Sequence, residues 1–235
     1  MAEPVKLQSS NRVWIGVIAA VVVVAVAVLT AINITGSDSK ESSAGNLAGI
    51  DDATALFAGV PQSGLEIGKA DAPVTIVEYL DIQCPHCKDA STSTVPTLIS
   101  QFVKTGQAKL KLQPIAFIGD DSTKGALAVL AAGQQNRAGE FAEILFRNQG
   151  GENAGWVSDG VLDGIASALK LDAGKFDDAR SSDAVKSDLK KIAAAATADQ
   201  VQSTPTFVIK GPKGQYQVQN RQNMAEFAQA IEKVK

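Results

Sequence analysis

Cysteine and histidine are scarce in this 235-residue chain, which contains two cysteines and one histidine. A structural zinc site usually has four cysteine or histidine ligands, so these three residues are too few to build one. No cysteine precedes Cys84, so a lipid-modified cysteine is not expected to anchor the chain. We therefore expect neither a metal nor another cofactor, and within the chain the two cysteines have only each other as disulfide partners.

Motifs that mark several other functions are also missing. No basic run is interleaved with aromatic residues, and none of the glycine patterns that bind phosphate groups is present. No repeat recurs at the period of a solenoid. The formal net charge of −3 also argues against a nucleic-acid partner. The cysteines are therefore the best candidates for chemistry.

The two cysteines form one C-x-x-C motif, Cys84-Pro85-His86-Cys87. In such a motif the second sulfur can attack a mixed disulfide that the first sulfur has formed, so the pair can exchange disulfides with other proteins. A purely structural disulfide is the alternative, but closing so short a loop removes little entropy from the unfolded chain. The single histidine lies between the cysteines, and we expect His86 to tune their redox behaviour.

One long hydrophobic run lies near the N-terminus. Residues 13–32 carry no charge and match the length needed to cross the hydrocarbon core of a membrane. A cleaved signal peptide is the alternative, although its apolar region is usually shorter, about 7–15 residues. We therefore expect a short tail at 1–12, a retained transmembrane anchor at 13–32 and a flexible polar linker at 33–49.

The charges around this run predict its orientation. Lys6 and Arg12 precede the run, whereas only Lys40 follows it closely. Positive residues favour the cytoplasmic side of a membrane. We therefore expect a single-pass membrane protein with a cytoplasmic N-terminus and one extracytoplasmic domain at 50–235.

The sequence around the cysteines predicts a strand followed by a helix. Val74–Leu80 is a β-branched and apolar run typical of a buried central strand. Pro85 suits the first position of a helix, which places Cys84 at the helix start, where free N–H groups stabilise a thiolate. We expect Cys84 to be the exposed, low-pKa nucleophile and Cys87 to be a buried, protonated thiol that resolves the mixed disulfide.

Hydrophobic patterns predict the remaining elements. The helix after Pro85 is expected to continue toward Phe102, with a kink or break at Pro96. The elements expected after it are a second strand at Ala108–Ile115, a helical block at about 122–198, a hairpin of Thr206–Lys210 and Gln215–Val218, and a last helix at about Met224–Val234.

This order of elements resembles the DsbA-like branch of the thioredoxin superfamily. The resemblance rests on the Cys84–Cys87 motif at a helix start, the inserted helical block, and the Thr204-Pro205 pair entering a strand. It covers nearly all of residues 60–235 and implies an α/β, thioredoxin-like fold. It also implies a cis proline at Pro205 and a backbone at Thr204 that pairs with substrate. Ser203 departs from the pattern, because many membrane-anchored relatives have glycine there.

The resemblance also singles out an acid in the strand before the cysteines. DsbA-like proteins have an acid six residues before the first cysteine, which is Glu78 here. This residue is expected to help move the proton of Cys87. An ordinary strand-end acid facing solvent is the alternative, and Asp81 is a competing candidate for the role.

The activity implied by the resemblance is thiol:disulfide exchange, in which the Cys84–Cys87 disulfide is donated to exported proteins with free thiols. A membrane reoxidase of the DsbB-like or vitamin K epoxide reductase-like type would restore the disulfide. Two alternatives stay open: a reductase or isomerase of the same fold, and a membrane-tethered binding or chaperone module with an inert disulfide. No added dimerisation domain is recognised, so a monomer is expected.

Overall fold

The computed structural model describes residues 47–235. The predicted tail at 1–12, the anchor at 13–32 and most of the linker at 33–49 lie outside this range. Within the described residues, no helix is both long and apolar enough to span a membrane. The anchor therefore stays a prediction from the sequence.

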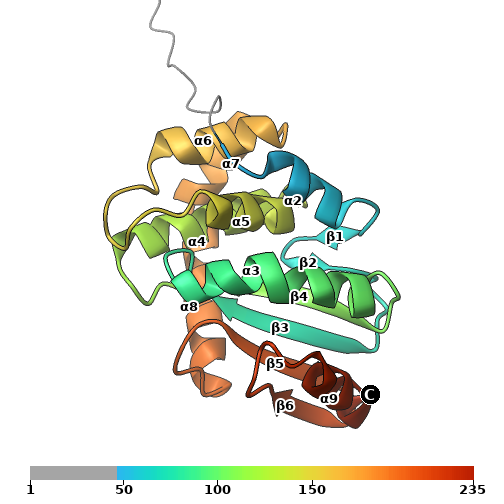
Figure 1. Ribbon diagram of the computed structural model, residues 1–235. Helices are drawn as coiled ribbons and strands as arrows, with labels where there is room; N and C mark the ends of the chain where they lie inside the picture. Colours follow the sequence, from blue (N-terminus) through green and yellow to red (C-terminus); the bar gives the residue numbers. More distant parts are fainter. Residues whose placement is uncertain (1–46) are drawn as a thin grey trace, which may run out of the picture. The chain divides into compact units, whose positions relative to one another are not determined.

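Figure 1 shows how the described elements follow one another. In chain order they are α2 (Ile50–Phe57), β1 (Gln62–Ser63), β2 (Glu66–Ile67), β3 (Val74–Leu80), α3 (Pro85–Leu98), the π-helix η2 (Ile99–Val103), β4 (Ala108–Pro114), α4 (Asp120–Gly133), α5 (Ala138–Arg147), α6 (Asp159–Ala168), α7 (Ala173–Ser181), α8 (Asp183–Ala198), β5 (Thr206–Gly211), β6 (Gly214–Gln217) and α9 (Met224–Val234).

The predicted central strand is confirmed. β3 lies inside a six-stranded sheet with the order β1-β2-β4-β3-β5-β6, and all of its residues except Thr75 are buried. It runs parallel to β4 and antiparallel to β5, with Tyr79 opposite Thr206. Because β5 runs the opposite way, its first residue lies beside the end of β3. The segments before Thr206 and after Leu80 therefore meet at one end of the sheet.

Helices cover both faces of this sheet (Figure 1). Glu78 of β3 lies on the face covered by α3 and α5. On the same face, α9 packs against β5 through an edge-to-face contact of Phe207 with Phe227, with ring centroids 5.4 Å apart. On the opposite face, the Tyr79 hydroxyl donates a 2.6 Å hydrogen bond to Asp199, which caps α8.

The predicted helical block is also confirmed and consists of the five helices α4 to α8, inserted between β4 and β5. Three of these helices have side-chain N-caps, in which Ser158, Asp172 and Ser182 accept hydrogen bonds from backbone N–H groups. Phe141 and Phe176 are fully buried and pack against each other inside the block, with ring centroids 5.3 Å apart. These rings belong to the same hydrophobic core as the buried side chains of the sheet.

The structure differs from the sequence prediction at two places: there is no break at Pro96, and there are elements before β3. Pro96 does not end the helix, because α3 continues to Leu98 and the chain then forms one π-helical turn, in which the N–H of Lys104 donates to the carbonyl of Ile99. The elements before β3 were not predicted. β1 and β2 have two residues each, which is too short for an alternating pattern, and β2 is defined by its pairing with β4.

Candidate active site

The loop after β3 places Cys84 at the start of α3. Cys84 is the N-cap of the helix, and Pro85 occupies the first helical position as predicted. The N–H of Cys84 donates to the carbonyl of Asp81 at 3.0 Å, and the Cys84 carbonyl accepts from the N–H groups of Cys87 and Lys88. The loop is therefore fixed by the backbone on both sides of the first cysteine.

Cys84 is less exposed than the sequence predicted. Only 7% of the residue is accessible, and its thiol donates a 3.3 Å hydrogen bond to the carbonyl of Thr204. Hydrogen bonding with the Cys87 thiol is the largest influence on its pKa, and the side chain of Thr204 and the N–H groups of Cys87 and His86 also contribute. Together they outweigh burial and lower the pKa of Cys84 to about 5. The expected low pKa therefore comes from hydrogen-bond donors rather than from exposure.

Cys87 has the opposite character. The residue is fully buried, and burial followed by the neighbouring Cys84 sulfur raises its pKa well above the usual value for a thiol. The N–H of Asp81 lies 3.4 Å from its sulfur. Both thiols are free in this structure, which is therefore the dithiol form. Near neutral pH the arrangement favours one thiolate at Cys84 and one protonated thiol at Cys87.

The loop before β5 completes this end of the sheet. The peptide bond between Thr204 and Pro205 is cis, as expected. The hydroxyl of Thr206 donates a 2.7 Å hydrogen bond to the carbonyl of Ser203, which closes the loop. Because the carbonyl of Thr204 accepts from the Cys84 thiol, two segments 120 residues apart in the sequence meet at the nucleophile.

His86 contributes to the site through its backbone. Its N–H is among the groups that lower the pKa of Cys84. Its imidazole is 70% exposed, and Nδ1 lies 3.8 Å from a carboxylate oxygen of Asp89. Any effect of the ring on the sulfur therefore acts through a well-solvated environment, where charge interactions are weak.

Glu78 is buried in the protein interior. The residue is 1% exposed, and its Oε1 atom has no hydrogen-bond partner. Burial, with a smaller contribution from the Glu143 carboxylate, raises the pKa of Glu78 to about 8. The alternative of a solvent-facing acid is therefore wrong. A buried acid whose pKa lies near neutrality is suited to proton transfer.

Asp81 is the competing candidate for proton transfer, but both oxygens of its carboxylate already accept hydrogen bonds. Its Oδ1 atom accepts from the Gln83 N–H at 2.9 Å and the Ser122 hydroxyl at 2.6 Å. Its Oδ2 atom accepts from the N–H groups of Phe117 and Ile118 at 2.7 and 3.1 Å. Asp81 therefore ties the loop after β4 and the start of α4 to the loop that carries Cys84.

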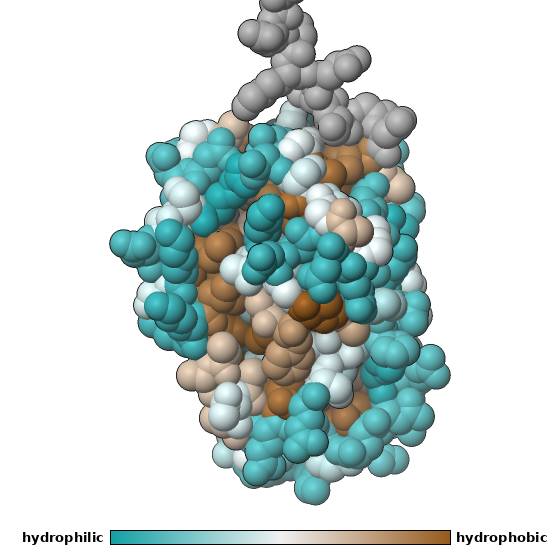
Figure 2. Space-filling model, turned by 90° about the vertical axis from the view of Figure 1, so that its left-hand side faces the viewer, coloured by the Kyte–Doolittle hydropathy of each residue, from teal (hydrophilic) through white to brown (hydrophobic). Residues whose placement is uncertain are grey.

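The Asp81 contacts hold an apolar side chain at the surface. Phe117 is 54% exposed and is the one large hydrophobic residue in the exposed class among residues 47–235. Figure 2 turns the end of the molecule where α3 begins toward the viewer, and apolar side chains gather there among polar ones. Exposed apolar surface of this kind marks contact sites for other proteins.

The sequence did not reveal several supporting residues. The side-chain amide of Gln149 donates to the carbonyl of Ile82 at 2.7 Å and to that of Cys84 at 3.1 Å. Ser91 and Glu143 lie close to Glu78. Gln149 and Glu143 are far from the motif in the sequence and belong to no local pattern, so no sequence signal could have found them.

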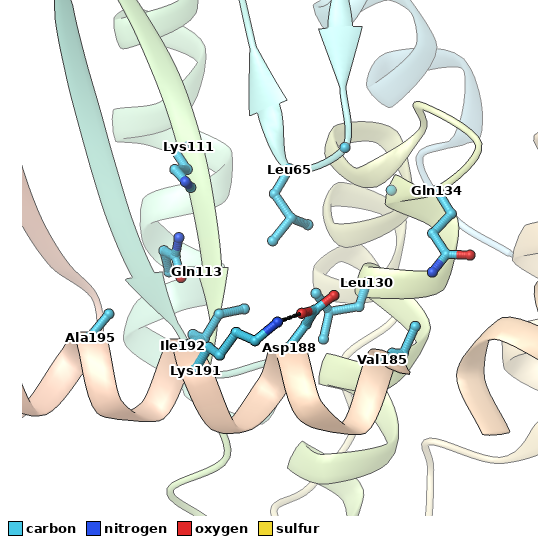
Figure 3. A pocket seen from close by; sticks show the side chains of 12 residues that line it. Leu65, Lys111, Gln113, Leu130, Gln134, Val185, Asp188, Lys191, Ile192 and Ala195 are labelled. Atoms are coloured by element: carbon cyan, nitrogen blue, oxygen red, sulfur yellow. Dashed lines mark hydrogen bonds and ion pairs between the residues drawn. The ribbon is translucent and has the colours of Figure 1, made fainter. Parts of the chain in front are cut away.

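Other potential binding sites lie away from the cysteines. A pocket of about 400 Å³ between β4, α4 and α8 is lined by apolar side chains together with Lys111, Gln113, Gln134, Asp188 and Lys191. Figure 3 shows Lys191 paired with Asp188 at its edge. None of the predicted site residues lines this pocket. In the described part of the chain, no group of three histidine, cysteine or acidic residues is arranged to hold a metal ion.

Comparisons with known proteins agree with this geometry. The family model described as Thioredoxin matches residues 62–233. Disulfide bond formation protein D of Bacillus subtilis is 28% identical over 170 residues, covering 71% of this chain and 75% of the relative. Probable disulfide bond formation protein D of Bacillus cereus is 29% identical over 160 residues, with coverages of 66% and 73%. Oxidised BdbD from Bacillus subtilis has a structure similar to this one, with a TM-score of 0.64, 26% identity and coverages of 74% and 96%.

Proposed function

The chain belongs to the thioredoxin family and is a DsbA-like thiol:disulfide oxidoreductase, and from that premise we propose that it forms disulfides in exported proteins by giving up its own Cys84–Cys87 bond. The pKa of about 5 at Cys84, beside a buried Cys87 thiol, is the observation that carries this direction. Stabilising the thiolate stabilises the reduced protein, which makes the disulfide a stronger oxidant.

The reaction begins with a thiolate of the substrate protein, which attacks Cys84 in the disulfide form. The Cys84–Cys87 bond breaks, its electron pair goes to the Cys87 sulfur, and a substrate–Cys84 disulfide forms. A second substrate thiolate then attacks the substrate sulfur and displaces Cys84 as a thiolate, for which the low pKa makes it a good leaving group. The substrate is oxidised by two electrons and the active-site pair is reduced.

The remaining predicted residues support these steps. Pro85 begins the helix whose first N–H groups face the Cys84 sulfur. Thr204 and Pro205 bind the substrate segment beside the nucleophile, because the Thr204 carbonyl already lies 3.3 Å from the Cys84 sulfur. Glu78 supplies a proton to Cys87 when that sulfur leaves.

The chain acts outside the cytoplasm. Residues 13–32 anchor it in the membrane, residues 1–12 stay in the cytoplasm and residues 33–49 tether the catalytic domain. A membrane reoxidase of the DsbB-like or vitamin K epoxide reductase-like type accepts the electrons of the reduced pair. The exposed Phe117 offers an apolar contact for such partners, and the protein works as a monomer.

The reduction potential of the Cys84/Cys87 pair tests this function. The protein is equilibrated in glutathione buffers of graded potential, and the oxidised fraction is trapped by alkylation. We expect a potential well above the roughly −270 mV of thioredoxin. A potential at or below that value would show that the pair reduces or reshuffles disulfides. Loss of both thiol-oxidising and disulfide-reducing turnover would instead identify a redox-inert binding module.

The same measurement tests the imidazole of His86. His86→Leu is expected to make the pair less oxidising, by about 20 mV, because an exposed charge contributes little. Asp89→Asn is the matched control, since it removes the carboxylate beside the ring and should shift the potential in the opposite direction. An unchanged potential in His86→Leu would limit the role of this residue to its backbone N–H.

A further inference from the structure

Polar side chains line a small cavity between β3, α3 and α5. The cavity has a volume of about 20 Å³, and its polar lining comes from Glu78, Ser91 and Glu143. This volume has room for one water molecule. Ser91 lies one helical turn after Cys87, so the two residues share the buried face of α3. The cavity therefore adjoins the helix face that carries the resolving cysteine.

Glu78 has unused hydrogen-bonding capacity in this cavity. Its Oε1 atom has no partner although the residue is 1% exposed. Its neighbours across the sheet, Leu112 and Phe207, are apolar. Since buried polar atoms are almost always paired, this oxygen is placed to bind the one water molecule for which the cavity has room.

Glu143 connects the same cavity to solvent. The residue is 2% exposed, and its Oε1 atom accepts from Nε of Arg147 at 2.9 Å. Arg147 also donates, through Nη1, to Asp52 at 2.9 Å. The Asp52 side chain is 68% exposed. A continuous series of polar groups therefore leads from the cavity to the surface.

The charged groups nearest to Glu78 come from α5, and those beyond them from α2. On α5, the Glu143 carboxylate raises the pKa of Glu78 together with burial, while Arg147 offsets part of the charge of Glu143. Beyond Arg147 lies Asp52 of α2. A second carboxylate this close disfavours ionisation of the first, because both are shielded from water.

We propose that Glu143 is a positioning residue for proton transfer. Its carboxylate keeps Glu78 protonated near neutral pH, so that Glu78 can supply the proton that Cys87 takes up when the disulfide opens. The inference rests on the proposed function and extends it to a residue in the inserted helical block. When Cys87 leaves with the electron pair, the Glu78 carboxyl gives its proton to the sulfur and becomes a carboxylate. Solvent then returns one proton to Glu78 through the cavity.

Infrared spectroscopy of the full-length protein in detergent tests this role directly. The difference between wild type and Glu78→Gln identifies the C=O band of the protonated Glu78 carboxyl, whose intensity is followed against pH. We expect a midpoint near pH 8 in the wild type. In Glu143→Gln the midpoint should fall by roughly one unit, because the like charge is gone. A small thiol opens the disulfide at a rate that depends on pH. The midpoint of that pH dependence should fall together with the midpoint of the Glu78 band.

Two further variants keep the test decisive. Arg147→Gln removes the charge that keeps the buried Glu143 ionised, so Glu143 should take up a proton and the Glu78 midpoint should fall as in Glu143→Gln. This variant gives a second way to remove the like charge if Glu143→Gln folds poorly. Glu140→Gln is the matched control, because Glu140 is also 2% exposed on α5 and paired with an arginine, but does not line the cavity. An unchanged midpoint in Glu143→Gln, an equal shift in Glu140→Gln, or no Glu78 band at all would overturn the proposal. The reduction potential would still decide the oxidase function separately.

Discussion

We expect Cys84→Ser to reduce the rate of disulfide donation to the uncatalysed rate. We expect Cys87→Ala, in contrast, to trap its substrates as mixed disulfides. The two outcomes differ because only Cys84 combines a low pKa with a sulfur at the helix start. Cys87 is fully buried and its pKa is raised, so it cannot begin the exchange. Without Cys87, no second sulfur of the protein can attack a mixed disulfide at Cys84, so the mixed disulfide accumulates.

The measurement uses oxidative folding of a reduced protein substrate in a buffer that contains glutathione disulfide, with acid quenching and non-reducing electrophoresis. Glutathione disulfide supplies the oxidising equivalents, because Cys87→Ala has no disulfide of its own: it forms a mixed disulfide with Cys84, from which a substrate thiolate displaces glutathione. Cys84→Ser should give no oxidised product beyond the uncatalysed rate and no mixed disulfide with the substrate. Cys87→Ala should give a band at the combined mass that disappears on reduction. A mixed disulfide that forms in Cys84→Ser would assign the attack to Cys87 and would reverse the roles proposed for the two sulfurs.

Asp81→Ala is expected to lower the free energy of unfolding by about 3 kcal/mol, because it leaves buried donors without an acceptor. The carboxylate accepts four hydrogen bonds, two at each oxygen, and the residue is fully buried. Its loss also frees the loop that carries Phe117 from the loop that carries Cys84. We therefore expect slower exchange with protein substrates than with small thiols in this variant.

Equilibrium unfolding in urea measures the stability change, with Asp71→Ala as the control. Asp71 is exposed, so its replacement should change the free energy of unfolding by no more than about 0.5 kcal/mol. Asp81→Asn keeps one acceptor oxygen and should lie between the wild type and Asp81→Ala. If Asp81→Ala were as stable as Asp71→Ala, the carboxylate would not hold the two loops together.

The sequence predicted the strands and helices that have strong local signals. Val74–Leu80 and Met224–Val234 match β3 and α9, because a β-branched apolar run and an amphipathic pattern are properties of neighbouring residues. β1 and β2 have no such signal, since they exist through pairing with each other and with β4. Of the kink or break expected at Pro96, the break does not occur, and Val95 and Leu98 near it are both buried.

By itself, the sequence determined where the chemistry lies. Two cysteines separated by two residues, the first of which is a proline that begins the helix, specify a nucleophile and its resolving partner from local geometry alone. Only the tertiary structure decided how deeply Cys84 is buried, that Asp81 is a structural acceptor, and that Glu143 lies beside Glu78. These features join segments up to 120 residues apart in the sequence. Such contacts depend on how the helices pack on the sheet, and no local pattern of residues encodes that packing.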